Sequence, residues 1–261
     1  MSLADVVGRV RSGVVHIEYS MGAERVASGT GFMAKHHLVT NHHVFSGPKN
    51  ATVTLGWQPD ANPTSRREVS LPYADFQRAL VSGSPENALD FAILDVPQLR
   101  AAGLYDLTLK RPTGYRVGDP IALLGFPLEH RNLTCHAGII SSFYSGGRAS
   151  IIQVDASVNQ SNSGGPLLDP STGEVLGIVT RKGTGLSRMF DQLLAAFDQN
   201  LAALQQARGI IGIGNVDPVA ALIAGQNQLK ALASEILRSA NVGIGYAFSV
   251  EHVLAERPFA N

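Results

Sequence analysis

The chain has 261 residues, of which 44% are hydrophobic and 16% charged, so it can bury a sizeable core in one large β domain or two small ones. Lysine plus arginine and aspartate plus glutamate number 21 each, and this balance gives no electrostatic reason to expect nucleic acid or an anionic membrane as a partner. The single cysteine, Cys135, excludes an intramolecular disulfide. With no signal-like apolar run at the start and no stretch of about 20 apolar residues, we expect a cytoplasmic protein.

The first two thirds of the chain alternate short apolar runs with turn residues, which is typical of antiparallel β structure. A mainly β fold is therefore predicted from about Val6 to about Gly183. The predicted strands, in chain order, are 14–20, 29–34, 37–44, 51–57, 90–96, 120–127, 137–144, 150–156 and 174–180.

Two helices are predicted after this β region. Apolar residues recur at helical spacing from about Leu186 to Arg208, and a second stripe follows Asp217 and Pro218. Those two residues form an acidic N-cap and a proline at the first helical position. The glycine-rich segment 209–216 separates the stripes. We therefore expect a helical hairpin, then a strand at 242–250 and a short closing helix.

Three short segments indicate nucleophilic catalysis, in the order His, Asp, Ser. TNHHV (40–44) places His43 after an apolar strand, Asp90 opens the run DFAIL (90–94), and SNSGGPLLD (161–169) places Ser163 in a glycine-bearing loop. A serine hydroxyl needs an imidazole as general base, and that imidazole needs a carboxylate to hold its tautomer. His43, Asp90 and Ser163 are therefore the predicted catalytic residues.

These segments belong to a longer series that resembles HtrA/Deg-like, trypsin-fold serine proteases of the chymotrypsin clan. The resemblance covers nearly the whole chain except the helical hairpin, and no PDZ-like sequence follows it. It implies a double six-stranded β-barrel with the active site between the barrels, and it aligns His43, not His42, with the catalytic base. The other segments that carry it are SGTGF (28–32), GDPIALLGFP (118–127), AGIIS (137–141), GEVLGIVT (173–180) and GIGYAFSV (243–250).

The resemblance implies one peptidase domain over residues 1–261. The first barrel would span about 1–105, and the second barrel with the closing helix about 106–185 and 241–261. The helical hairpin, about 186–240, would be an insertion near the C-terminus. The implied activity is that of a serine endopeptidase, which hydrolyses protein substrates through an acyl-enzyme and needs neither a metal nor an organic cofactor.

One departure from the family concerns the oxyanion hole, the backbone N–H groups that bind the negatively charged oxygen of the transition state. The resemblance assigns it to Ser161, Asn162 and Ser163, where the family usually has glycine at the first position. Serine keeps the N–H, but its Cβ would strain a positive φ. A malformed hole would leave the alternative function: a weak or latent trypsin-fold protein that binds a partner through the cleft and the helical hairpin.

The same alignment outlines the pocket for the side chain before the scissile bond. Ser157 takes the place of the acidic residue that gives trypsin its basic preference, so Lys and Arg are disfavoured. A small or medium apolar side chain is expected instead. The remaining predicted substrate-binding residues are Val158 and Ala247 near the pocket, and Thr180, Arg181 and Lys182 on a strand that would pair with substrate backbone.

Other features have less specific interpretations. The histidine cluster 36–43 does not favour a metal, because neighbours on a strand point to opposite faces, and His36 and His37 fit a surface turn. Cys135 is expected to be a small buried hydrophobe. The hairpin either buries its stripes internally and against the barrel, or serves as a lid or partner-docking surface. The sequence leaves the natural substrate, oligomeric state and regulatory trigger open.

Overall fold

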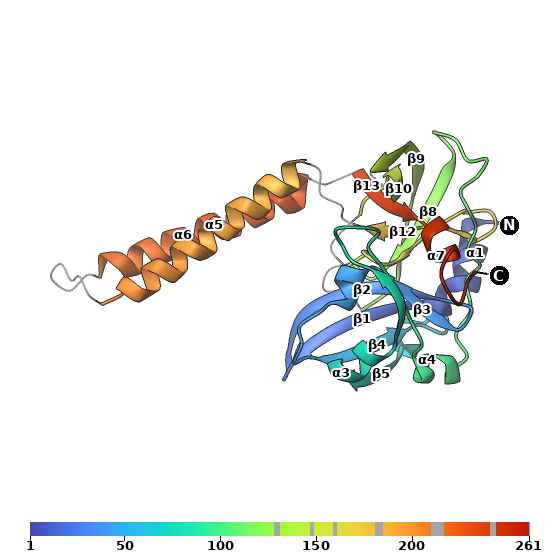
Figure 1. Ribbon diagram of the computed structural model, residues 1–261, viewed down its shortest axis with the longest axis horizontal. Helices are drawn as coiled ribbons and strands as arrows, with labels where there is room; N and C mark the ends of the chain where they lie inside the picture. Colours follow the sequence, from blue (N-terminus) through green and yellow to red (C-terminus); the bar gives the residue numbers. More distant parts are fainter. Residues whose placement is uncertain are drawn as a thin grey trace. The chain divides into compact units, whose positions relative to one another are not determined.

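The computed structural model describes residues 1–127, 131–146, 149–158, 161–180, 185–209, 217–240 and 244–260. They form two compact units. The first comprises Met1–Arg181 with Gly243–Asn261 and holds the β structure, and the second, Lys182–Val242, holds two long helices (Figure 1). All three predicted catalytic residues belong to the first unit.

The chain opens with helix α1 (Leu3–Val10), which precedes the first predicted strand and was not predicted. A capping box starts the helix: the Ser2 hydroxyl accepts a hydrogen bond from the Asp5 backbone, and the Asp5 carboxylate accepts one from the Ser2 backbone. Val6 and Val10 are buried against residues of both sheets. A short 3-10 turn (Arg11–Gly13) then leads into the first strand.

The first sheet is antiparallel and has seven strands, where the resemblance implies six. Its order is β5-β4-β1-β2-β3-β7-β6. The β2–β3 turn contains Lys35 and His36, both with positive φ, so His36 lies in the turn as predicted and His37 begins β3. The strands are β1 (Val14–Met21), β2 (Glu24–Ala34), β3 (His37–Thr40), β4 (Thr52–Trp57), β5 (Arg67–Pro72), β6 (Leu80–Ser84) and β7 (Phe91–Leu94).

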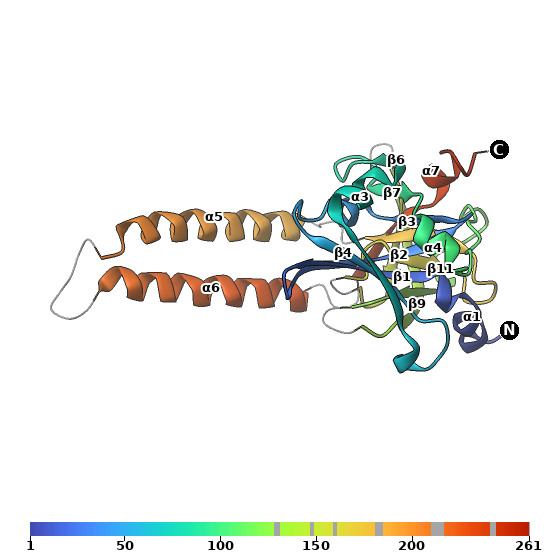
Figure 2. The same ribbon diagram turned by 90° about the horizontal axis from the view of Figure 1, so that it is seen from below.

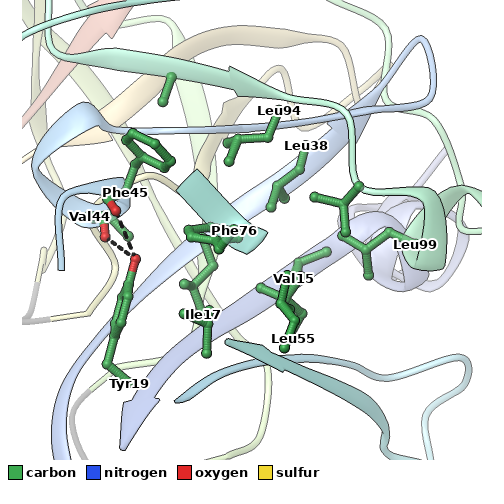
Figure 3. Packing of buried hydrophobic residues seen from close by; sticks show 14 of the residues in the cluster. Val15, Ile17, Tyr19, Leu38, Val44, Phe45, Leu55, Phe76, Leu94 and Leu99 are labelled. Carbon is green, nitrogen blue, oxygen red and sulfur yellow. Dashed lines mark hydrogen bonds between the residues drawn. The ribbon is translucent and has the colours of Figure 1, made fainter. Parts of the chain in front are cut away.

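Alternate residues of β1 build the core of this sheet. Ile17 and Tyr19 are buried against Phe76 on the short helix α3 (Tyr73–Arg78) (Figure 3). The Tyr19 hydroxyl also donates to the backbone carbonyls of Val44, at 2.6 Å, and Phe45, at 3.2 Å. Because Val44 and Phe45 directly follow His43, this buried tyrosine fixes the segment that carries the predicted base. Another short helix, α4 (Pro97–Ala101), follows β7.

The prediction of one strand over 37–44 is wrong. Strand β3 ends at Thr40, and His42 begins the helical turn α2 (His42–Phe45), in which the Phe45 N–H bonds the Asn41 carbonyl. The strand argument against a metal therefore does not apply to His42 and His43. The His42 ring packs edge-on against Phe45, with 5.7 Å between centroids. Within the described residues, no group of three His, Cys, Asp or Glu side chains could hold a metal ion.

The second sheet closes into a six-stranded barrel, in the order β10-β13-β12-β11-β8-β9 (Figure 1). Its interior is apolar and includes Ile152, Leu167 and Ala247. Cys135 lies exposed on β9, so the prediction that it is buried is wrong. The strands are β8 (Pro120–Gly125), β9 (Thr134–Gly146), β10 (Ala149–Asp155), β11 (Pro166–Leu168), β12 (Val175–Thr180) and β13 (Ile244–Ser249), and helix α7 (Glu251–Leu254) follows.

The second unit is the predicted helical hairpin: α5 (Gly185–Ala207) and α6 (Pro218–Ala240) lie side by side (Figures 1 and 2). The Asp217 carboxylate caps α6 by accepting hydrogen bonds from the backbones of Val219 and Ala220, at 2.9 and 3.2 Å. Leu201 and Val219 are buried, and Lys230 pairs with Asp198 across the helices. No helix in the described part of the chain is both long and apolar enough to cross a membrane.

Candidate active site

Asp90 is the most constrained side chain of the candidate site. It is 2% exposed and precedes β7 with a φ of +49°, a conformation that only surrounding contacts can maintain. Its Oδ2 lies 2.9 Å from His43 Nδ1, and its Oδ1 accepts a hydrogen bond from the His43 backbone at 3.1 Å. The Asn41 side chain donates to the Asp90 carbonyl at 2.9 Å. These contacts bring two of the three predicted catalytic residues together.

The pairing fixes how His43 can act. The tautomer that donates its Nδ1–H to Asp90 leaves Nε2 as a proton acceptor. The His43 side chain remains 29% exposed, while the Asp90 side chain is only 3% exposed. The buried carboxylate therefore contacts Nδ1 of a partly exposed imidazole, and Nε2 is the nitrogen that can accept a proton.

Ser163 lies in a loop that is pressed against the first sheet. The Ser163 carbonyl accepts a hydrogen bond from Thr30 N, at 2.9 Å, and Gly164 N donates to the Val179 carbonyl at 2.8 Å. Gly164 has a φ of +87°, and a Cβ on it would lie 2.0 Å from the Thr30 carbonyl oxygen and 3.1 Å from Asn41 N. Only glycine fits this position. The loop thus abuts the segment that leads to His43, although within the described residues no hydrogen bond joins the Ser163 hydroxyl to His43.

The predicted oxyanion segment has the strain that sequence analysis anticipated. Ser161 has a φ of +72°. Its carbonyl accepts a hydrogen bond from Thr30 Oγ1 at 2.6 Å, and its hydroxyl lies 2.7 Å from the hydroxyl of Ser28. In the part of the chain that the structure describes, neither Ser161 N–H nor Ser163 N–H has a hydrogen-bond partner.

Asn162 lies beneath this loop. Its side chain is fully buried against Gly125, where an added Cβ would come within 2.6 Å of Asn162 Oδ1. Neither polar atom of the Asn162 side chain has a hydrogen-bond partner among the described residues. Asn162 therefore supports the loop by packing against Gly125.

The predicted specificity residues do not form one cluster. Ser157 is exposed, whereas Val158 and Ala247 belong to the core of the closed barrel. Thr180 is buried, and its hydroxyl donates to Asp90 Oδ2 at 3.3 Å, which links it to the carboxylate that contacts His43. Arg181 and Lys182 lie outside the described residues.

Sequence reasoning missed three residues that fix this site: Ser28, Thr30 and Asn41. Ser28 and Thr30 stand inside the quoted segment SGTGF and Asn41 inside TNHHV, so membership of these segments was a usable signal. Their roles depend on contacts made across the fold, because Thr30 is 131 residues from Ser161 and Asn41 is 49 residues from Asp90.

The closed six-stranded barrel, the seven-stranded first sheet and the His–Asp pair beside a Ser-Gly-Gly loop define a trypsin-like fold. A model of the trypsin-like peptidase domain matches residues 29–178, and the chain belongs to that family. This result confirms the predicted fold class and, with the relatives below, the resemblance to HtrA/Deg proteases.

Serine protease HTRA1A of Danio rerio is 34% identical over 200 residues, which are 70% of this chain and 37% of that protein. Protease Do-like 5, chloroplastic, of Arabidopsis thaliana is 34% identical over 181 residues, 61% of this chain and 51% of that protein. The chain thus spans between 37% and 51% of the length of these curated relatives.

Two solved structures extend the comparison. The HtrA-type protease AlgWS227A with tripeptide has a TM-score of 0.54 at 28% identity, over 69% of this chain and 54% of that one. The serine endoprotease from Yersinia pestis has a TM-score of 0.52 at 28% identity, over 69% and 57%. Both similarities involve proteases of the type that the sequence motifs indicate.

Proposed function

We propose that this protein is a serine endopeptidase that hydrolyses peptide bonds of protein substrates through an acyl-enzyme. The observation that carries the proposal is the 2.9 Å contact between His43 Nδ1 and the buried Asp90 carboxylate. A buried carboxylate on Nδ1 orients the imidazole and stabilises its protonated form, which a serine nucleophile requires. Membership of the trypsin-like peptidase family supports the same conclusion.

In the proposed reaction, Ser163 Oγ attacks the scissile carbonyl carbon while His43 Nε2 takes the hydroxyl proton. The resulting tetrahedral intermediate collapses, the C–N bond breaks, and His43 gives its proton to the leaving amine. Water then attacks the acyl-enzyme; His43 accepts one of its protons and returns it to Ser163. Asp90 keeps hold of Nδ1–H throughout. The cycle needs no metal and no organic cofactor.

The backbone N–H groups of Ser161 and Ser163 would bind the oxyanion in both tetrahedral intermediates. Their lack of partners among the described residues supports this role, and in comparable sites removing one donor costs about 10²–10³-fold in kcat. Asn162 would contribute by keeping the segment packed against Gly125. The oxyanion donors would therefore be two backbone groups on either side of a buried asparagine.

The proposed substrates are unfolded or extended protein segments. A related solved structure contains a tripeptide, and the strand that ends at Thr180 would pair with substrate backbone, together with Arg181 and Lys182. Ser157 offers no carboxylate to a basic side chain, so small or medium apolar residues are proposed before the scissile bond.

A second candidate is a weak or latent trypsin-fold protein that binds a partner through the cleft and the helical hairpin. The observation that favours it is the positive φ of Ser161, since a Cβ there disfavours the loop conformation. Fluorophosphonate labelling separates the two functions, because the reagent forms a bond only with an activated serine.

The test uses the purified full chain with Ser163→Ala as the control, and intact mass as the readout. One adduct on the wild type and none on the variant is the result expected of an endopeptidase. A folded wild type that stays unlabelled would reject the endopeptidase proposal in favour of the binding protein.

A further inference from the structure

The backbone at Ser161 takes a conformation that is disfavoured for a residue with a Cβ. Its φ of +72° lies in the left-handed region, which glycine occupies freely and serine does not. The backbone from Ser161 to Ser163 carries the N–H groups of the proposed oxyanion hole, so relaxation of Ser161 to a negative φ would turn its N–H away. Some contact must therefore hold the residue in place.

The contacts that hold it come from one strand. Ser161 Oγ lies 2.7 Å from Ser28 Oγ, and the Ser161 carbonyl accepts a hydrogen bond from Thr30 Oγ1 at 2.6 Å. Thr30 N also donates to the Ser163 carbonyl at 2.9 Å. Strand β2 thus holds the loop by one hydrogen bond between the hydroxyls of Ser28 and Ser161 and by two hydrogen bonds that Thr30 donates. Of these, the Ser28 bond alone uses the side chain of Ser161.

Strand β2 is a firm support for these contacts. Ser28 and Thr30 are alternate residues, so their side chains project from the same face. They pair with Glu18 and His16 on β1, and Gly31, next to Thr30, pairs with Thr40 on β3. Thr30 is fully buried, and its hydroxyl also accepts a hydrogen bond from Phe126 N at 3.1 Å. A side chain tied to this strand cannot move without disturbing the sheet.

We propose that Ser28 is a positioning residue that holds the oxyanion hole in its binding conformation through the Ser161 hydroxyl. This inference rests on the proposed endopeptidase function and concerns the same site. A glycine at position 161 would adopt a positive φ freely but could make no such bond. In this chain Ser161 lacks the backbone freedom of glycine, and its hydrogen bond to Ser28 stabilises the positive φ instead.

The test is a double-mutant cycle on the full chain, with a peptide ester as substrate. Ser28→Ala should lower kcat about tenfold and change KM less than about twofold, because the bond sets transition-state geometry. Ser28→Thr keeps the hydroxyl and should restore kcat. In the Ser161→Gly background, Ser28→Ala should change kcat less than about twofold, since the bond is already absent. Equal losses in both backgrounds would overturn the proposal.

Hydrogen exchange gives a readout that does not need activity. Gly164 N and Gly165 N are hydrogen-bonded, to Val179 and Asn162 respectively, so their amides report opening of the loop. Ser28→Ala should speed their exchange, and Ser28→Thr should not. The matched control is Ser70→Ala, which breaks a hydroxyl pair with Thr54 elsewhere on the same sheet (2.8 Å) and should leave both amides unchanged.

The outcomes separate the two proposals. An unlabelled wild type would reject the endopeptidase, while the exchange of Gly164 and Gly165 would still decide whether Ser28 holds the loop. A labelled wild type whose kcat and loop exchange are unaffected by Ser28→Ala would reject the role of Ser28 and leave the endopeptidase standing.

Discussion

Thr180 and His43 bind the same carboxylate oxygen: Thr180 Oγ1 lies 3.3 Å from Asp90 Oδ2, and His43 Nδ1 lies 2.9 Å from it. Thr180 is the last residue of β12, in the closed barrel, while His43 and Asp90 belong to the first sheet. The carboxylate therefore joins the two halves of the first unit. A residue that the sequence assigned to substrate binding also fixes the proposed catalytic pair.

Thr180→Val should lower kcat by about three- to tenfold, because it removes one donor, worth about 1 kcal/mol, from the carboxylate that orients His43. Asp90→Asn should cost far more, about 10³–10⁴-fold, since an amide would favour the wrong tautomer. Initial rates on a peptide ester would measure both. The matched control is Thr54→Val, the same substitution at a half-buried threonine of β4 whose hydroxyl pairs with Ser70. Equal effects of the two valine variants would contradict the assignment.

Gly164→Ala should destabilise the protein by about 3 kcal/mol or more and abolish labelling of Ser163. The added Cβ would lie 2.0 Å from the Thr30 carbonyl oxygen, at a φ of +87°, so both steric overlap and backbone strain oppose it. Gly103→Ala is a matched control: Gly103 has a φ of +66° but no atom within 4 Å of the added Cβ. That variant should lose only about 1 kcal/mol. Urea denaturation would measure the free energy of unfolding of both variants. Similar losses of stability would show that steric overlap at Gly164 contributes nothing beyond backbone strain.

The helical hairpin could be predicted because it depends on local pattern, and local motifs also marked the three segments of the candidate site. Asp217 and Pro218 correctly predicted the start of α6. The Ser2–Asp5 capping box was an equally local signal for α1 and was overlooked. The helical turn at His42 was missed because the predicted strand was extended past Thr40 into the polar residues Asn41, His42 and His43.

The contacts that complete the site could not be predicted from one sequence. The Ser28–Ser161 pair spans 133 residues and the Thr180–Asp90 pair spans 90, so both depend on strand register and on how the two sheets meet. The residues of the specificity pocket were harder still to predict. Val158 and Ala247 look like pocket residues by position, yet barrel closure buries them in the core.

A fully buried histidine in the first sheet predicts instability in acid. His16 is 0% exposed and stacks on Phe126, with 4.9 Å between ring centroids. Burial lowers the pKa of His16 to about 3, and the charges of Arg66, Arg25 and Arg131 act in the same direction. The nearby Glu18 carboxylate, 3.5 Å from His16 Nδ1, does not reverse this, since it also pairs with Arg131 and Arg25.

The unfolded chain takes up a proton at His16 as pH falls through about 6.5, whereas the folded protein does not until about pH 3. Stability should therefore fall with decreasing pH across that window, by up to about 1.4 kcal/mol per pH unit. Burial also lowers the pKa of His136, which adds to the loss. Urea denaturation at about pH 7.5, 6 and 5 would measure how far the free energy of unfolding decreases as the pH falls. That decrease should be smaller for His16→Gln than for His136→Gln. NMR titration of the wild type offers an independent check, because a His16 ring that gains a proton near pH 6 would contradict the prediction.

Removal of the helical hairpin should leave the first unit folded. Strands β12 and β13 pair directly, from Gly177 with Ser249 to Thr180 with Tyr246, so a short Gly-Ser loop in place of residues 182–242 can join neighbouring strand ends. The hairpin has buried residues of its own, including Leu201 and Ala233. The variant should lose helical circular dichroism, keep the unfolding midpoint of the β unit within about 3 °C and still be labelled at Ser163.

Leu201→Asp is the matched point variant and should unfold the hairpin alone. If either change unfolds the β unit, the hairpin is part of its core; faster turnover of small substrates would instead identify the hairpin as a lid.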